Sequence, residues 1–236
     1  MTQRTQLQVV KSEEGEIFDI ELEEDLLEKN RLLAEENRRL LDQHRVIAID
    51  IMGSVGSGKT SLIMQMTSRL RGKCSIGVIA GDLTTTIDAE RMKSLGAEVV
   101  QINTGKECHL DANLVKKALA SLDLERMDLL FIENVGNLIC PAEFPLGSHK
   151  RAVVISVTEG PYMVVKHPYI FMDADVVAIN KMDLARAMGV DMRQLERDAL
   201  KIKPDLRVIR TNCLTGEGVD RVIQALECTN LPHPKA

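Results

Sequence analysis

The sequence predicts an α/β fold with a mostly parallel, doubly wound sheet of about seven strands and flanking helices. From residue 45 onward, short runs rich in β-branched residues alternate with helical stretches. The strand runs are "RVIAIDIM", "CSIGVIA", "EVVQI", "DLLFIE", "AVVISV", "DVVAIN" and "LRVIR". They are apolar throughout, which is typical of strands covered by helices on both faces. A second observation supports the same fold class: a glycine-rich loop directly follows the first strand.

An amphipathic helix is predicted ahead of the sheet, over residues 22–43, "LEEDLLEKNRLLAEENRRLLDQ". Leu26 and Leu33 belong to a set of leucines spaced at helical intervals among charged residues. Such an apolar stripe requires a surface to cover, so we expect this helix to pack on the α/β domain. The expected organisation is an N-terminal extension over 1–21, this helix, and the α/β domain over 44–236.

Composition excludes several classes of protein. The net charge of −5, with both signs interspersed, argues against a nucleic-acid partner, which usually meets a basic surface. No run of 18 apolar residues occurs, and the acidic start lacks a signal-peptide core, so we expect a cytoplasmic protein with no membrane segment. Five widely spaced cysteines indicate reduced thiols and no disulfide framework.

The segment "GSVGSGKT", residues 53–60, predicts a phosphate-binding loop and hence a P-loop NTPase. It matches G-x-x-x-x-G-K-[ST] between a strand and a helical stretch, which is the required context. Its glycines allow backbone N–H groups to surround a phosphate, and the following helix directs its positive end there. We expect Lys59 to reach the β- and γ-phosphates and Thr60 to hold Mg²⁺. The expected nucleotide-binding residues of this loop are Gly53, Ser54, Val55, Gly56, Ser57, Gly58, Lys59, Thr60 and Ser61.

The base is expected to be read by "NKMD", in which Asn180, Lys181 and Asp183 follow the strand "DVVAI". This N-K-x-D pattern resembles the guanine-specificity motif of GTPases. A carboxylate at Asp183 can accept hydrogen bonds from guanine N1–H and its 2-amino group, a donor pair that adenine lacks, so GTP is favoured over ATP. The later loop "TNCLTGEG" is expected to close over the guanine through Leu214 and Thr215.

Carboxylates between these two motifs are candidates for sensing the γ-phosphate. Asp82 and Asp88 follow the second strand run, and Glu133 ends the fourth. Near a phosphate loop, such groups hold Mg²⁺ together with Thr60, or orient the attacking water. The expected catalytic residues are therefore Lys59, Asp82, Asp88 and Glu133, with Asp82 and Glu133 also candidates for Mg²⁺. For Asp88, capping the helix that follows is an equally suitable role.

As a whole the chain resembles the HypB family of GTPase accessory proteins for nickel insertion into [NiFe]-hydrogenase. The segments "GSVGSGKTSL", "GDLTTTIDAERM", "NTGKECHLDA", "FIENVGNLICPAEFPLG", "TEGPYMVVKHPYIF" and "NKMDL" carry this resemblance, over about residues 22 to 228. It implies a slow GTPase that uses Mg²⁺ and forms a GTP-dependent homodimer. It also implies a nickel-delivery partner protein and the hydrogenase large-subunit precursor as partners. Unlike some bacterial members, this chain has no N-terminal cysteine cluster or histidine-rich stretch, so a nickel store is not expected.

The resemblance also implies a site for Zn²⁺ or Ni²⁺ formed by Cys108, His109 and Cys140. Thiolate and imidazole ligands suit both metals, although a Cys-His pair with one distant cysteine is by itself a poor metal signature. His149 is kept as a weaker candidate ligand because it follows Cys140 closely. For Lys166 the resemblance implies a dimer-facing lysine that reaches the partner's nucleotide, and a solvated lysine is equally compatible with the sequence.

The remaining cysteines are expected to be structural: Cys74 as a buried strand residue, with Cys213 and Cys228 in similar roles. Two alternatives to the metal-binding GTPase remain. One is a metal-binding scaffold whose nucleotide pocket is regulatory. The other is an accessory GTPase of the urease type, related to UreG. Against the second, Cys140 is followed by Pro141 and Ala142, whereas the urease-type proteins have a Cys-Pro-His arrangement.

Overall fold

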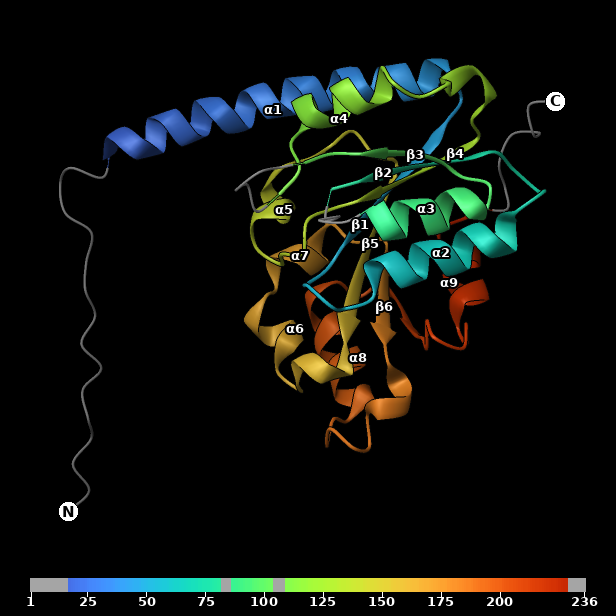
Figure 1. Cartoon of the computed structure of the whole chain (residues 1–236). Helices are drawn as coiled ribbons and strands as arrows, with labels where there is room; N and C mark the ends of the chain where they lie inside the picture. Colours follow the sequence, from blue (N-terminus) through green and yellow to red (C-terminus); the bar gives the residue numbers. More distant parts are fainter. Residues whose placement is uncertain (1–16, 82–85, 104–108, 229–236) are drawn as a thin grey trace.

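The computed structural model describes residues 17–81, 86–103 and 109–228, and in this part of the chain it contains one seven-stranded sheet (Figure 1). Every strand pair in the sheet is parallel, as expected. The strand order is β3-β2-β4-β1-β5-β6-β7. The strands are β1 (Ile47–Met52), β2 (Ile76–Ala80), β3 (Glu98–Gln101), β4 (Leu129–Glu133), β5 (Lys150–Ser156), β6 (Val176–Asn180) and β7 (Arg207–Arg210).

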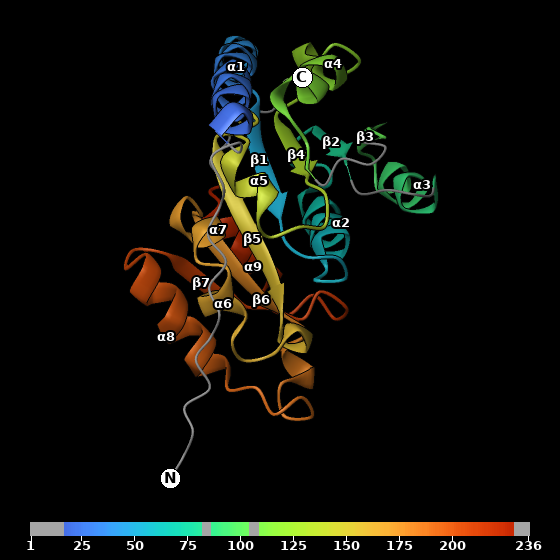
Figure 2. The same cartoon turned by 90° about the vertical axis from the view of Figure 1, so that its left-hand side faces the viewer.

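Helices cover both faces of this sheet (Figures 1 and 2). One face packs against α2 (Lys59–Leu70), α3 (Thr86–Ser94) and α9 (Val219–Ala225). The other face packs against α1 (Ile17–Gln43) and α4 (Ala112–Leu119) over its β2, β4 and β1 part. Beside these helices, the same face packs against the helices α5 (Cys140–Glu143), α6 (Met163–Lys166), α7 (Tyr169–Met172) and α8 (Met192–Ile202).

The central strand β1 illustrates why its sequence is apolar without alternation. Ile49 and Ile51 pack in the cluster beneath α2, whereas Ala48 packs in the cluster beneath α1 and α4. Because successive strand residues point to opposite faces, both sets must be apolar when both faces are covered. Ala48, Ile49 and Ile51 are all fully buried. Asp50 is the polar exception in this run.

The first helix differs in extent from the expectation. It spans 27 residues from Ile17 to Gln43, so it begins inside the segment predicted as an extension, five residues before the expected start at residue 22. Leu26, expected on the packed stripe, is 56% exposed. The buried line of this helix is formed instead by Asn30, Ala34, Asn37 and Leu41. No helix in the described part of the chain has the length and hydropathy needed to span a membrane.

Candidate nucleotide and metal site

The phosphate loop connects β1 to α2 and depends on two glycines for its shape. Gly58 precedes α2 with φ of 106°, and a Cβ atom there would lie 2.1 Å from Nδ2 of Asn180. Gly53 has φ of 150°, and a Cβ atom there would lie 2.2 Å from the carbonyl oxygen of Val154. Neither position has room for a side chain, because Gly53 lies against the backbone of β5 and Gly58 lies against the side chain of Asn180 at the end of β6. This close packing holds the loop backbone and the start of α2 close to the ends of β5 and β6.

Lys59 and Thr60 lie at the start of α2, as the motif predicts. The Lys59 ammonium donates hydrogen bonds to the carbonyl oxygens of Gly53 and Ser54, each at 3.2 Å, and therefore lies across the loop. The Thr60 hydroxyl donates to Oε1 of Glu133 at 2.5 Å. Glu133 is the last residue of β4 and is 1% exposed. Two of the expected Mg²⁺ ligands are thus adjacent, while Asp82 lies outside the described residues.

Asn180 connects the phosphate loop to the end of the site where base recognition is predicted. Its Nδ2 donates to the carbonyl oxygen of Ser57 at 2.8 Å, and its Oδ1 accepts from the backbone N–H of Cys213 at 3.0 Å. Asn212 then donates through Nδ2 to Oδ1 of Asp183 at 3.0 Å. The same asparagine accepts from the N–H of Leu214 at 3.0 Å. These bonds hold the Asp183 carboxylate in place beside the loop that carries Leu214.

A cavity of about 510 Å³ lies between the two motifs. Its phosphate end is lined by Gly56, Gly58, Lys59, Thr60 and Ser61, and its base end by Asn180, Lys181, Asp183, Leu184, Asn212, Cys213 and Leu214. Thr215 is exposed, and its N–H donates to Oδ1 of Asn212 at 3.3 Å. Asn212 belongs to the predicted loop "TNCLTGEG", but the sequence analysis did not single it out as a site residue. A cavity of this volume that extends from the phosphate loop to the Asp183 carboxylate suits one nucleotide.

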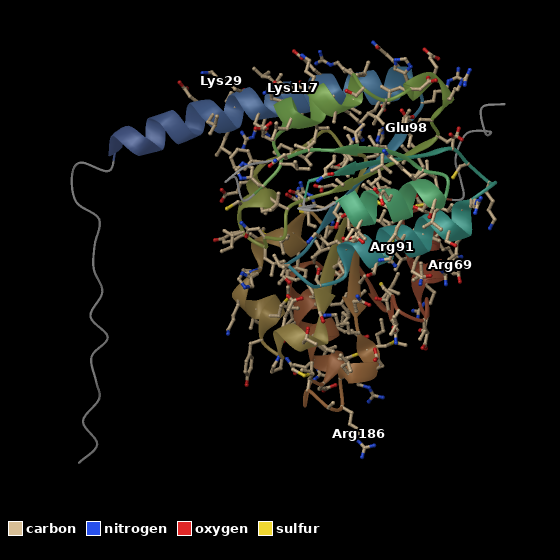
Figure 3. The ribbon with its side chains drawn as sticks, viewed as in Figure 1. Lys29, Arg69, Arg91, Glu98, Lys117 and Arg186 are labelled. Carbon is tan, nitrogen blue, oxygen red and sulfur yellow. The ribbon has the colours of Figure 1, made fainter. Side chains whose placement is uncertain are left out.

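Helix α3 contributes two further residues to the wall of this cavity, Asp88 and Arg91. Arg91, labelled in Figure 3, was not among the predicted residues. Its Nη1 lies 3.4 Å from Oδ1 of Asp88. Asp88 lies in the first turn of α3, which begins at Thr86, whereas a capping residue precedes its helix. The capping interpretation of Asp88 therefore does not fit the described helix, its side chain lines the cavity, and its catalytic role stays a prediction.

Glu159 is a carboxylate near the phosphate loop that the sequence reasoning missed. It closes a capping box with Ser156, whose backbone N–H donates to Oε1 of Glu159 at 2.8 Å. Burial raises the pKa of this carboxyl above its usual value, and the charges of Lys181 and Lys59 oppose that rise. The segment "SVTE" has the S-x-x-E spacing of a capping box, and this signal could have revealed it.

The two segments that carry expected metal ligands, those of His109 and Cys140, are in contact. The His109 ring stacks on Phe144 with ring centroids 3.9 Å apart. Phe144 directly follows α5, whose first residue is Cys140. Cys108 lies outside the described residues, and no group of three histidine, cysteine or acidic side chains suited to a metal occurs among those that are described. The three-residue ligand set therefore stays a prediction.

Comparison with known proteins agrees with this architecture. The family model described as "CobW/HypB/UreG, nucleotide-binding domain" matches residues 47–210. A curated relative from Methanocaldococcus jannaschii, named "Probable hydrogenase maturation factor HypB", is 53% identical over 88% of this chain and 94% of its own length. The chain belongs to the HypB family of hydrogenase maturation factors.

Solved HypB structures have the same fold. The crystal structure of HypB from Archaeoglobus fulgidus has a TM-score of 0.80 and 44% identity, covering 85% of this chain and 98% of that one. HypB from Helicobacter pylori, crystallised in complex with nickel, has a TM-score of 0.78 and 31% identity, covering 86% of this chain and 98% of that one. Membership in the HypB family confirms both the predicted fold class and the recognition made from the motifs.

Within this HypB-family chain, the three cysteines outside the predicted metal site differ in how well they match the prediction. Cys74 lies in the bend before β2 and is half-buried, so its assignment as a buried strand residue is wrong. Burial raises the pKa of its thiol to about 11. Cys213 and Cys228 are buried, with pKa values raised to about 11 and about 12, as suits structural thiols that stay protonated.

His149 does not join the metal segments. Its Nδ1 accepts from the backbone N–H of Ala48 at 3.0 Å, and its Nε2 lies 2.9 Å from Oδ1 of Asp42. Both ring nitrogens thus hold α1 and β1 together, which rules out the weaker ligand assignment. Lys166 ends α6 and is exposed, and its role toward a partner subunit stays a prediction.

Proposed function

We propose that this chain is a slow GTPase that uses GTP binding and hydrolysis to time nickel delivery during maturation of [NiFe]-hydrogenase. The observation that carries this proposal is the hydrogen bond between Thr60 and Glu133. It joins the phosphate-binding helix to the strand that leads, seven residues later, to Cys140. A change at the nucleotide can therefore reach a metal-binding segment through a short stretch of chain.

Selection of GTP rests on Asp183. Its carboxylate lines the cavity and is oriented by Asn212, so it can accept from guanine N1–H and the 2-amino group. Adenine offers no such donor pair, and a desolvated carboxylate without a partner costs about 1–3 kcal/mol. We therefore propose GTP and GDP as the nucleotides of this site.

Mg²⁺ fits the residues at the phosphate end. The Thr60 hydroxyl and the Glu133 carboxylate supply adjacent oxygen atoms, the donor type that this hard cation requires. These two residues, with Asp82, would hold the ion, which when bound neutralises charge on the β- and γ-phosphates. Lys59 and Asp88 both line the cavity, which supports roles for Lys59 in binding the same phosphates and for Asp88 in turnover. We propose that these residues, with Glu133, form the hydrolytic machinery.

Nickel is the proposed cargo, with Cys108, His109 and Cys140 as ligands and Zn²⁺ as the competing metal. The stacking of His109 on Phe144 supports this set, because it brings together the segments of His109 and Cys140. Three ligands leave a tetrahedral metal with one further position, which suits delivery better than a closed cage. The nickel complex of the Helicobacter pylori relative agrees with this cargo.

The proposed assembly is a cytoplasmic homodimer that forms with GTP, in which Lys166 reaches the partner's nucleotide. A nickel-delivery protein and the hydrogenase large-subunit precursor are the proposed partners on either side of metal transfer. The described part of the chain offers an exposed surface around Lys166 that includes Tyr162, Val165 and Tyr169. Such aromatic and aliphatic groups are typical of surfaces that bind another protein.

Phosphate release from GTP and from ATP in the presence of Mg²⁺ tests the enzymatic part. Release from GTP by the wild-type chain should exceed that by Lys59→Ala, and release from ATP should match the background. Nickel binding is measured in parallel by titration. Metal binding without any phosphate release above the Lys59→Ala background would overturn the GTPase proposal and favour a scaffold with a regulatory nucleotide pocket.

A further inference from the structure

Two asparagines are buried in the packed face of α1, where an amphipathic helix normally carries apolar residues. Asn30 is 5% exposed and Asn37 is fully buried, while the residues between them on the same face include buried Ala34. A buried amide without partners is costly, and a leucine would fill the same space with a gain from apolar burial. The hydrogen-bond partners of these two amides therefore indicate why asparagine occupies these positions.

Asn30 bridges two segments that are far apart in sequence. Its Oδ1 accepts from the backbone N–H of Ala112 at 2.8 Å. Its Nδ2 donates to the carbonyl oxygen of Pro145 at 2.9 Å. Both polar atoms of one side chain are thus used, one on each segment.

Asn37, two helical turns further along α1, repeats the bridge. Its Nδ2 donates to the carbonyl oxygen of Ala112 at 2.8 Å and to that of Leu146 at 3.1 Å. Ala112 is therefore held through both its N–H and its carbonyl group. Four hydrogen bonds from one helix face connect the same two segments.

These segments are the ones that carry His109 and Cys140. Ala112 begins α4, three residues after His109, and Pro145 lies five residues after Cys140. The segments also touch directly through the stacking of His109 on Phe144. The hydrogen bonds from α1 and this ring contact thus connect the same pair of segments.

The packing of α1 against the second segment is close. Gly147 has φ of 94°, and a Cβ atom there would lie 2.5 Å from the carbonyl oxygen of Ala34 and 2.8 Å from Cβ of Asn37. Figures 1 and 2 show α1 lying along α4, and Lys29, labelled in Figure 3, is exposed on the helix beside Asn30. The helix therefore has a defined inner face that meets backbone atoms of both segments.

We propose that Asn30 and Asn37 are positioning residues for metal binding, and that α1 fixes the separation and orientation of the segments that carry His109 and Cys140. This inference rests on the proposed metal function of those two residues. Buried amides that hydrogen-bond to backbone specify one arrangement, whereas apolar contacts would allow the segments to shift along the helix. A preorganised site binds its metal more tightly because less ordering is required on binding.

Nickel titration of Asn30→Ala and Asn37→Ala tests the proposal. Each variant should bind nickel up to about 10-fold more weakly than the wild type, the lower end of the effect of removing a direct partner of a metal ligand, because these asparagines bond the backbone beside the ligand residues. The thiolate-to-nickel absorption band should change in energy or intensity, while GDP affinity stays at the wild-type value. Leu41→Ala is the matched control, because it removes a fully buried side chain from the same helix without touching the four hydrogen bonds.

Asn30→Asp provides a second variant in case an alanine variant does not fold. It keeps an acceptor for the N–H of Ala112 but places a carboxylate oxygen against the carbonyl of Pro145, so it should also weaken nickel binding. The inference is overturned if nickel affinity is unchanged in the folded asparagine variants, or if Leu41→Ala weakens it equally. Failure of the proposed function has a different signature: the wild type would bind no nickel, or would bind it equally after Cys140→Ala.

Discussion

Thr60 and Glu133 share a hydrogen bond of 2.5 Å that joins the first turn of α2 to the carboxyl end of β4. The two residues are 73 positions apart in sequence, and parallel pairing of β1 with β4 brings them together. Ile51 of β1 is paired with Glu133 in this register, so the strand end and the phosphate loop lie at the same edge of the sheet.

This contact predicts that Glu133→Gln separates nucleotide binding from turnover. A glutamine oxygen can still accept from Thr60, so the fold and GDP affinity should be preserved. Loss of the Glu133 charge should weaken Mg²⁺ binding at the phosphate end of the site. Phosphate release should therefore fall about 10- to 100-fold. Phosphate release measured over a series of Mg²⁺ concentrations checks this. A variant with wild-type turnover and the same Mg²⁺ dependence would remove Glu133 from the hydrolytic machinery.

Asp183→Asn should change the preferred base. The amide cannot accept from both guanine donors, so GTP affinity should fall by about 1–3 kcal/mol, while xanthosine triphosphate, whose 2-oxo group needs a donor, should bind better. Competition binding against a fluorescent GDP analogue measures both. Equal affinity of the wild-type chain for ATP and GTP would contradict this assignment.

Gly58→Ala should abolish nucleotide binding because its Cβ atom would meet Asn180 at 2.1 Å, inside the phosphate site. Gly72→Ala is a control at a comparable positive φ of 74°, where nothing lies within 4 Å of the added Cβ atom. Left-handed backbone costs either alanine about 1–2 kcal/mol of unfolding free energy. Urea unfolding should detect destabilisation in both variants, whereas GDP titration should detect loss of affinity in Gly58→Ala alone.

Asp50 makes the stability of the chain depend on pH. Burial raises the pKa of its carboxyl to about 6 despite the opposing charge of Arg151, whose Nε lies 3.6 Å from Oδ2. Since the folded-state pKa is above the unfolded value of 3.8, the folded state binds the extra proton between these values. The stabilising contribution of protonated Asp50 is therefore fully present below about pH 4 and is lost as the pH rises through about 6.

The size of this effect is at most about 3 kcal/mol, at 1.36 kcal/mol for each unit of pKa difference. Asp50→Asn should remove it, so the unfolding free energy of the wild type minus that of the variant should fall between pH 4 and pH 6.5. Urea unfolding of both proteins at matched pH values measures this difference. A difference that stays constant or rises over the interval would contradict the burial effect.

Lys166→Glu should weaken GTP-dependent dimerisation or GTP affinity if this lysine reaches the partner's nucleotide. The reversed charge would repel the phosphates, and sedimentation with a saturating GTP analogue measures the outcome. Lys201, an exposed lysine in α8 that pairs with Asp198, provides a charge-reversal control. Wild-type sedimentation and affinity in Lys166→Glu would identify it as a solvated lysine.

Many site residues could be predicted from the sequence because their chemistry is local. Residues 53–60 form a continuous phosphate loop, and Asn180 and Asp183 are three positions apart in a motif that follows a strand. Each motif is recognised by short-range spacing, and the strand runs are recognised by their uniform apolar character. The nucleotide-binding fold and the family could therefore be inferred before any contact was known.

Tertiary structure alone decided which distant side chains meet. The bonds of Asn30 to Ala112 and Pro145 span 82 and 115 residues, and no local pattern distinguishes a bridging asparagine from a solvated one. The capping alternative for Asp88 failed because α3 begins at Thr86, and helix boundaries depend on packing as well as on local residues. The sequence by itself determined the elements and the chemistry of the nucleotide motifs, since these depend on neighbouring residues. Strand order and helix packing determined which other residues contact the nucleotide motifs and the metal-ligand segments. These contacts join segments far apart in the chain, so they depend on tertiary packing and strand register.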